Sequence, residues 1–322
     1  MNILLTAINA KYIHSNLAVY SLRACAGEYR DAVELAEYTI NNQKDYILEE
    51  LYKRKPDVLC FSCYIWNIDY VTDIAREYKK LCPSVPIWVG GPEVSYEVEA
   101  FLRENPYIDG VMIGEGEDTF RELCGYYAHK RKLSDIAGIA FRKNSTGNST
   151  SVNNIGGNKA GEIVFTSPRP IKNMSEIPFC YDTLDDFSNR IIYYESSRGC
   201  PFSCSYCLSS VDKTLRFRDT EIVKRELKFF IDQKVPQIKF VDRTFNCNHA
   251  HAMELWRFIK ANDNGVTNFH FEISADLLNQ EELELISDMR PGLIQLEIGV
   301  QSTNEVTIKE IHRTMKLERL KE

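Results

Sequence analysis

The sequence lacks several features that would place it outside ordinary globular proteins. It has no run of about 18 consecutive apolar residues, which excludes a predicted transmembrane helix. Basic residues are not in excess, since 39 Lys and Arg against 46 Asp and Glu leave a net charge of −7. That balance argues against binding to nucleic acid through a broad basic face. The amino-terminal residues have no basic segment and no small-residue cleavage site, so they favour a first strand over a signal peptide. We therefore expect a cytoplasmic protein that binds no membrane.

No repeat with the period of a solenoid is present, which excludes that architecture. What the chain does have is ample material for a core, because 44% of its residues are hydrophobic and 26% are charged. A length of 322 residues favours two domains.

Residues 1–135 alternate between apolar strand patterns and amphipathic helix patterns. The expected strands are 3–8, 33–38, 58–62, 87–89 and 111–113, each followed by a helix. This alternation predicts an α/β fold with a parallel, doubly wound sheet, Rossmann-like and of flavodoxin-like strand order. Ligands bind such sheets beyond the carboxyl ends of the strands. Those ends carry Asn9, Ser62, Gly90-Gly91 and Gly114-Glu115-Gly116.

Residues 136–185 change in composition and predict a hairpin and a linker. The stretch 143–166 is rich in Ser, Asn, Gly and Thr, which indicates a flexible loop between two pairing strands. Residues 186–322 then resume the alternation, with strands expected at 191–195, 238–241, 269–273 and 293–298. Four successive β/α units predict a (β/α) barrel of the TIM type, or part of one.

Ten cysteines stand out in a chain without a secretory signal, where a disulfide framework is not expected. Three of them, Cys200, Cys204 and Cys207, form a Cys-x3-Cys-x2-Cys cluster. Three thiolates in one loop can hold a [4Fe–4S] cluster and leave one iron without a protein ligand. Structural zinc would need a fourth ligand, for which Cys180 or Cys247 is available. A third interpretation is that these cysteines are inert core residues.

The segment around these cysteines, RGCPFSCSYC, resembles the signature of the radical S-adenosylmethionine (SAM) superfamily, with Tyr206 at the aromatic position. The resemblance implies that SAM chelates the open iron of the cluster. Reduction by an external donor such as flavodoxin or ferredoxin would then cleave SAM to methionine and a 5′-deoxyadenosyl radical.

Other segments resemble the SAM-contacting parts of this superfamily, namely FVDRTF at 240–245, HFEISADL at 270–277 and LEIGVQST at 296–303. The resemblance implies SAM contacts from Tyr206, Arg216, Arg218, Asp242, Glu272, Glu297 and Gln301. The alternative for these charged side chains is that they are solvated or paired with one another. No catalytic residue is identified.

The amino-terminal segments VGGP and DGVMIGEGEDTF, followed by RGCPF, resemble the cobalamin-binding class of radical SAM proteins. The resemblance implies that cobalamin is held by Ser62, Gly90, Gly91, Gly114, Glu115 and Gly116. A D-x-H-x-x-G motif is missing from the sequence, and His14 is the one histidine in a suitable amino-terminal loop. We therefore expect cobalamin without a histidine ligand to cobalt, or a domain that kept the fold and lost the cofactor.

The leading hypothesis is a cobalamin-dependent radical SAM enzyme, of iron–sulfur oxidoreductase type, that performs methyl transfer or radical rearrangement on an unknown substrate. The alternatives are a methylthiotransferase-like enzyme acting on tRNA, with a second cluster, and a non-catalytic iron–sulfur or zinc module. The resemblance also implies a barrel of about six β/α units. Since four can be counted, we expect a truncated chain that lacks activity by itself.

Overall fold

The chain forms two compact units in the computed structural model, which describes residues 1–143, 161–211 and 213–321. The first unit contains Met1–Lys172 and Ile177–Arg190, and the second contains Asn173–Glu176 and the chain from Ile191 onward. Most of the flexible loop expected at 143–166 lies outside the described residues. Within the described residues, no helix combines the length and the apolar character that crossing a membrane would require.

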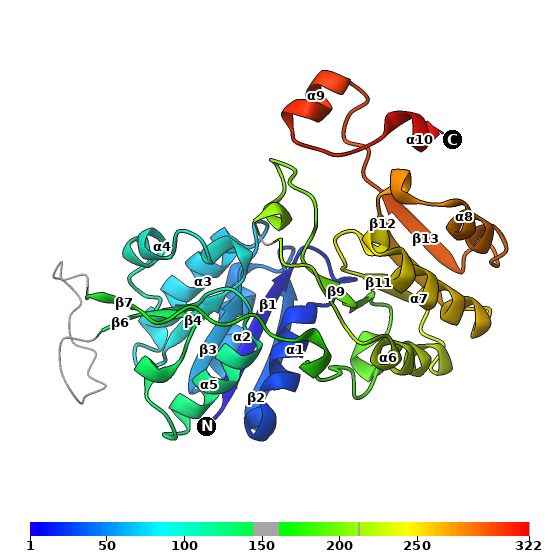
Figure 1. Cartoon of the computed structure of the whole chain (residues 1–322). Coiled ribbons are helices and arrows are strands. Elements are labelled where there is room, and N and C mark those ends of the chain that lie inside the picture. Colours follow the sequence, from blue (N-terminus) through cyan, green and yellow to red (C-terminus); the bar gives the residue numbers. More distant parts are fainter. Residues whose placement is uncertain (144–160, 212, 322) are drawn as a thin grey trace. The chain divides into compact units, whose positions relative to one another are not determined.

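The first unit is built on a seven-stranded sheet with the order β2-β1-β3-β4-β5-β6-β7 (Figure 1). Its first five strands are parallel, which confirms the predicted flavodoxin-like order. They are β1 (Ile3–Asn9), β2 (Val33–Thr39), β3 (Val58–Ser62), β4 (Ile87–Gly90) and β5 (Gly110–Met112). β1 and β3 are buried along their whole length, as expected for parallel strands covered on both faces.

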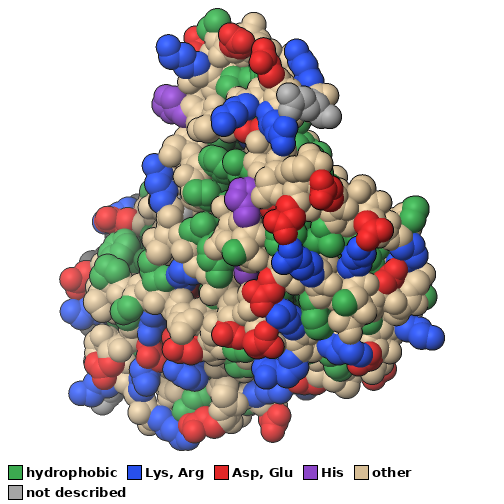
Figure 2. Space-filling view, turned by 45° about the vertical axis from the view of Figure 1, so that its right-hand side comes forward, with side chains coloured by type: hydrophobic (Ala, Val, Ile, Leu, Met, Phe, Trp, Pro, Cys, Tyr) green, Lys and Arg blue, Asp and Glu red, His purple; other side chains and the backbone are tan. Residues whose placement is uncertain are grey.

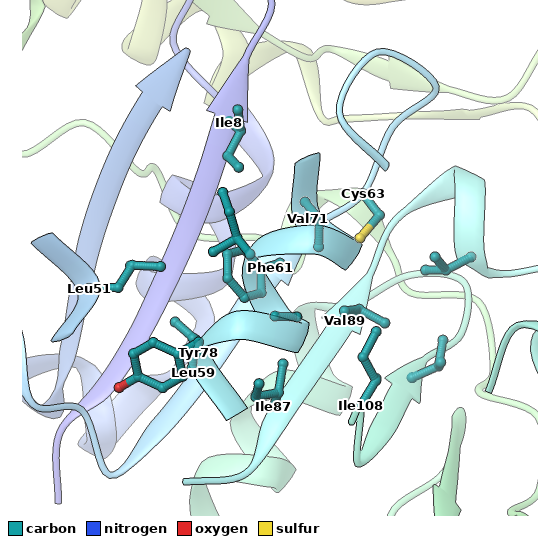
Figure 3. Close-up of a cluster of buried hydrophobic side chains, with 14 of the residues drawn as sticks. Ile8, Leu51, Leu59, Phe61, Cys63, Val71, Tyr78, Ile87, Val89 and Ile108 are labelled. Atoms are coloured by element: carbon teal, nitrogen blue, oxygen red, sulfur yellow. The ribbon is translucent and has the colours of Figure 1, made fainter. Parts of the chain in front are cut away.

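Five helices connect these strands and cover the two faces of the sheet. They are α1 (Leu17–Cys25), α2 (Lys44–Arg54), α3 (Ile68–Leu81), α4 (Val98–Glu104) and α5 (Glu117–Tyr127). The apolar sides of α2, α3 and α4 pack on one face, and α1 and α5 pack together on the other. Figure 3 shows the first of these cores, in which Phe61 and Val89 of the sheet meet Leu51 and Tyr78 of the helices.

A hairpin completes the first sheet. Strands β6 (Ile139–Arg142) and β7 (Ile163–Phe165) pair antiparallel, and β6 also pairs antiparallel with β5. The predicted hairpin is therefore present, and its strands extend the sheet of the first unit.

The second unit contains a four-stranded parallel sheet with the order β13-β12-β11-β8. Its strands are β8 (Ile192–Tyr194), β11 (Gln237–Phe240), β12 (Asn268–Ile273) and β13 (Ile294–Ile298). Helices α6 (Thr220–Asp232), α7 (His249–Ala261) and α8 (Gln280–Ser287) follow β8, β11 and β12, and lie along one face of the sheet (Figure 1). Strands paired in chain order with intervening helices match the predicted incomplete (β/α) barrel.

Two helices begin beside more than one residue of capping type. Thr220 is the first residue of α6, and Asp219 caps that helix by accepting hydrogen bonds from the backbone of Glu221 and Ile222. Asp45 lies in the first turn of α2, whose N-cap position is taken by Gln43. Sequence spacing alone does not separate such neighbours.

Aromatic side chains form the core under the second sheet. Phe271 of β12 is fully buried, and its ring centroid lies 4.5 Å from that of Phe240 and 4.3 Å from that of Phe245. Trp256 of α7 meets Phe271 edge-on at 6.1 Å. These contacts hold the helices against the strands.

We predict that Phe271→Ala lowers the free energy of unfolding by about 3–5 kcal/mol, because it leaves a cavity in this core. Denaturant unfolding of the full chain measures the change. Leu283→Ala is the control, since Leu283 is 41% exposed on α8 and its loss should cost under about 1 kcal/mol. Equal destabilisation by the two variants would contradict this account of the core.

Candidate cofactor sites

The carboxyl ends of the parallel strands form the candidate site of the first unit. In the sheet register Ser62 pairs with Gly90, and Gly90 with Met112, so two of the predicted cobalamin residues are neighbours on one edge. The strand order reverses between β1 and β3, which is where ligands bind in such sheets.

Buried amides hold the loops that follow β1 and β3. The Asn16 side chain donates a 3.2 Å hydrogen bond to the Ser62 hydroxyl. Asn67 is fully buried, and its amide donates to the carbonyls of Ile8 and Ser62, each at 3.0 Å. The Ser62 hydroxyl accepts from Asn16, and a hydroxyl that accepts in this way can still donate its own proton.

A partly buried ion pair fixes the loop after β1 from its other side. Glu37 of β2 accepts hydrogen bonds from the Asn9 amide at 2.9 Å and from the Asn16 backbone at 2.8 Å, and it pairs with Arg190 at 2.7 Å. Tyr20 also donates to Glu37, and burial together with this carboxylate raises the pKa of its phenol. Sequence reasoning missed Glu37, because nothing in its strand pattern marks it as a hydrogen-bonding centre.

The predicted glycines play different parts at this edge. Gly91 has φ +119°, and a Cβ there would lie 2.4 Å from the Cys63 carbonyl oxygen, so the backbone requires glycine. At Gly116, just before α5, a Cβ would lie 2.9 Å from the Leu22 side chain. Gly114 has φ +75° and open space beside it, so it is the glycine at which a ligand can approach the backbone.

Ser95 connects the two glycine loops and was not predicted. Its hydroxyl donates to the Gly91 carbonyl at 2.8 Å and accepts from the Gly114 backbone at 3.4 Å. A hollow of about 350 Å³ begins at this serine and runs along the start of α4. Glu115 points elsewhere, since its carboxylate accepts from the Lys172 backbone at 3.4 Å.

Exposed aromatic side chains lie on the same two loops. Tyr12 follows β1 and is 68% exposed, while Ile65 and Trp66 follow β3 and are 79% and 44% exposed. The rings of Tyr64 and Trp66 stack with their centroids 4.4 Å apart. An apolar patch on a ligand-binding edge indicates a contact surface. The consecutive residues Tyr64-Ile65-Trp66 directly after a buried strand were the available signal for it.

The second candidate site is the cysteine loop of the second unit. It leaves β9 (Ser197–Arg198) and returns as β10 (Arg216–Phe217), two short strands that pair antiparallel. Gly199 has φ +96°, and a Cβ there would lie 2.5 Å from the Thr214 carbonyl oxygen, so the loop can close only over glycine.

The three cysteines of the motif share this loop. Cys200 and Cys204 are 8% and 7% exposed, and the Cys200 sulfur lies 3.8 Å from the Thr244 hydroxyl. Among the described residues, no three His, Cys, Asp or Glu side chains are gathered closely enough to hold a metal ion. The three thiols of the loop are therefore not arranged around one point in this structure. Their chemistry nevertheless fits an iron–sulfur cluster, which is held by cysteine sulfur.

Four of the remaining thiols, Cys25, Cys60, Cys63 and Cys124, are buried. Burial raises the pKa of Cys25 to about 11, of Cys124 to about 12 and of Cys247 to about 11, which favours the protonated form of each. Burial raises the pKa values of Cys60 and Cys63 as well. Thiols buried in this way give no positive support to the tRNA methylthiotransferase and zinc-module alternatives. Basic and acidic side chains also alternate over the face in Figure 2, with no broad basic area.

Asp242, predicted to contact SAM, is engaged within the protein. This carboxylate is fully buried and accepts hydrogen bonds from the Ser196 backbone at 2.9 Å and from the Ser196 and Ser197 hydroxyls at 2.7 and 2.5 Å. These bonds engage both of its oxygens. Its role here is to tie the end of β11 to the residues that begin the cysteine loop. The Ser196 hydroxyl also lies 3.1 Å from His251, whose pKa burial lowers to about 4.

Arg218, also predicted to contact SAM, forms an ion pair within the protein. It is 7% exposed and lies 2.7 Å from Glu226 of α6, whose other carboxylate oxygen accepts from Tyr194 at 2.6 Å. A guanidinium held in this way anchors the end of β10 to α6. Arg216 of β10 donates to the Thr214 carbonyl at 3.4 Å at the base of the loop.

Glu272 and Glu297 lie on the face of the second sheet opposite its helices, opposite each other across β12 and β13. Lys239 holds both, at 3.5 Å from Glu272 and 2.8 Å from Glu297, and His270 lies 3.1 Å from Glu297. The hydrogen bond from Lys239 lowers the pKa of Glu297. The sequence did not identify Lys239 or His270, although both fall on the alternating polar positions of their strands.

Tyr206 and Gln301 both lie close to Arg313. Tyr206 is 52% exposed, and its hydroxyl accepts a 3.0 Å hydrogen bond from Arg313. Gln301 has φ +65° just beyond β13, and its amide folds back over Gly299. Two residues of the predicted SAM set are thus brought to the same end of the second sheet.

Comparison with known proteins matches each unit to a protein family. Residues 3–124 match the B12 binding domain family, and residues 194–322 match the radical SAM superfamily. The chain is 31% identical over 218 residues to an uncharacterized methyltransferase, PH0819, of Pyrococcus horikoshii, covering 65% of this chain and 44% of that one. It is 29% identical over 251 residues to the cobalamin-dependent radical SAM methyltransferase TokK of Streptomyces tokunonensis, covering 71% and 33%.

Among solved structures, the cobalamin-dependent SAM radical enzyme OxsB with aqua-cobalamin and SAM matches with a TM-score of 0.75 at 17% identity, covering 98% of this chain and 46% of that one. The chain thus spans between a third and a half of the length of these proteins. The expected family and the two-part fold are confirmed. The B12-binding domain implies cobalamin, and the radical SAM domain implies a [4Fe–4S] cluster and SAM.

We predict a pH-dependent stability difference between the wild type and Asp242→Asn. Burial raises the pKa of Asp242 to about 6 from its usual 3.8, so the folded state binds a proton more tightly than the unfolded state. Wild-type stability relative to the variant should therefore be highest below pH 4 and fall by about 2–3 kcal/mol as the pH rises through 6. Denaturant unfolding of both proteins between pH 4 and 7 measures it, and a constant difference would contradict the assignment.

Proposed function

Because this chain belongs to the radical SAM superfamily in the form that carries a B12-binding domain, we propose that it is a cobalamin-dependent radical SAM enzyme of the methyltransferase type. One observation carries the proposal. Three thiols lie on a single loop, which closes at Gly199 and follows the first strand of a parallel sheet. The same chain holds a second sheet of the B12-binding type, at whose edge Gly114 has open space beside its backbone. The substrate is unknown, and radical rearrangement is the other reaction that fits these cofactors.

Cys200, Cys204 and Cys207 would hold the cluster, since they are the thiols that share one loop. Gly199 closes that loop, and Asp242 holds its start through Ser196 and Ser197. When bound, the cluster and SAM supply one-electron cleavage of SAM, and cobalamin supplies a methyl carrier. An external reductant of the flavodoxin or ferredoxin kind would deliver the electron.

In the first unit, Ser62, Gly90 and Gly114 would hold cobalamin, with Gly114 offering the closest approach to the backbone, while Glu115 is turned toward the Lys172 backbone. Gly91 and Gly116 act by letting the surrounding chain pack closely. The exposed rings of Tyr12 and Trp66 add an apolar surface on the same edge, which suits the flat face of a corrin. We expect no histidine ligand to cobalt from this chain.

We predict that Cys204→Ala abolishes cluster binding, because two thiolates do not retain a cluster that needs three. After anaerobic reconstitution, the wild type should hold about four irons per chain and form 5′-deoxyadenosine with dithionite and SAM. The variant should lose the visible charge-transfer absorbance and the product. Cys247→Ala is the matched control and should keep both. A wild type that holds its full cluster and forms no 5′-deoxyadenosine would contradict SAM cleavage by this chain.

We predict that Gly114→Val weakens retention of hydroxocobalamin by about tenfold or more, because the new side chain fills the space at the strand edge. Retention is measured by the corrin absorbance that stays with the protein after gel filtration. Gly265→Val is a close control. Gly265 has the same φ of +75° and the same open surroundings, but lies in the second unit, so the backbone strain is matched. Equal retention by the two variants would contradict the assignment of Gly114.

A further inference from the structure

Residues 309–321 form a locally basic segment beside the cysteine loop. They hold five Lys and Arg against two Glu, whereas the whole chain carries a net charge of −7. The segment runs from the end of α9 (Glu305–Glu310) through α10 (Leu317–Lys321). Positive charge therefore gathers on one short segment of an acidic chain, and such a concentration attracts an oppositely charged partner.

Two hydrogen bonds hold this basic segment against the cysteine loop. The Ser205 backbone donates to the Ile311 carbonyl at 3.0 Å, and Arg313 donates to the Tyr206 hydroxyl at 3.0 Å. Both partners in the loop stand between the second and third cysteines of the motif. Ile308 is 7% exposed, so a buried side chain also seats α9 on the unit. The basic segment thus lies directly beside the thiols that would hold the cluster.

The lysines of the second unit divide into paired and unpaired ones. Four of the nine form ion pairs, namely Lys224, Lys228, Lys239 and Lys260. The other five are exposed and form no ion pair with a described residue. Four of these five lie in the cysteine loop or the basic segment, namely Lys213, Lys309, Lys316 and Lys321. The fifth, Lys234, precedes β11 at the opposite edge of the sheet. Uncompensated positive charge is therefore concentrated at the cysteine loop.

Apolar side chains are exposed on the same two segments. Leu208 and Val211 follow the motif and are 49% and 61% exposed, and Val306 of α9 is 66% exposed. Exposed apolar side chains among charged ones are typical of protein–protein contact surfaces. Electron-transfer partners in particular meet over small interfaces, and charge complementarity raises the rate at which they associate.

We propose that the basic segment and the adjoining Leu208 and Val211 form the docking surface for an acidic protein that donates single electrons. This inference rests on the proposed function and locates the contact of its external reductant. The donor gives up one electron, passing from an anionic flavin hydroquinone to the neutral semiquinone. The same electron reduces the cluster by one unit of charge, and no proton is transferred.

The test uses the anaerobically reconstituted full chain, the double variant Lys309→Glu/Lys316→Glu and a flavodoxin as the probe. Titration calorimetry measures the affinity for oxidised flavodoxin. At an ionic strength of about 0.01 M the variant should bind about tenfold more weakly or worse, and at about 0.3 M the gap should shrink to about threefold or less. Formation of 5′-deoxyadenosine driven by dithionite should stay within about twofold of the wild type, because dithionite needs no docking surface.

Lys228→Glu/Lys234→Glu is the matched control, since it changes the net charge equally at the other edge of the sheet and should keep the affinity for flavodoxin. Equal losses in the two double variants, or no loss in either, would overturn the inference. Loss of cluster iron in Lys309→Glu/Lys316→Glu would overturn it as well, because these residues would then act on the loop itself.

Other occupants give different results. Self-association of the wild type that Lys309→Glu/Lys316→Glu abolishes, or tighter binding of bulk tRNA than of flavodoxin, would assign the surface elsewhere and overturn the inference. A wild type that cleaves SAM with dithionite and binds no flavodoxin would also overturn it while leaving the proposed function intact. A wild type that holds its cluster and forms no 5′-deoxyadenosine with dithionite would instead contradict the proposed function.

Discussion

The carboxyl ends of parallel strands meet at one edge of a sheet, and both candidate sites of this chain depend on that constraint. In the first unit it brings Ser62 beside Gly90, although 28 positions separate them along the chain. In the second unit it places the cysteine loop after β8 at the same end as Asp242 after β11 and Gln301 after β13. Residue types that carry chemistry therefore accumulate where the backbone turns, while the strands themselves supply the core.

Buried carboxylates fix these edges. Glu37 organises the loop after β1, Asp242 holds the start of the cysteine loop, and Glu226 holds the strand by which that loop returns. Each accepts hydrogen bonds from several donors, so its desolvation is offset by partners from distant parts of the chain. A loop held in this way presents its cysteines or glycines in a defined place, which a binding site requires.

The sequence by itself determined the order of elements, the two-part architecture and the identity of the cysteine loop, because these follow from apolar periodicity and from close spacing along the chain. The strands of both sheets were predicted within about two residues. Gly91 and Gly199 could also be recognised as special from their motifs, although the atoms that they avoid, the carbonyls of Cys63 and Thr214, became clear only in the structure.

Only the tertiary structure decided which polar residues are engaged within the protein. Asp242 and Arg218 had the right chemistry and the right strand ends, yet serine hydroxyls and a glutamate from other elements enclose them. Glu37, Ser95, Lys239 and Arg313 carry no local signal, since their roles are set by partners that lie far away in the sequence. Whether a charged side chain is free for a ligand depends on what folding packs against it, and a pattern along one segment does not contain that information.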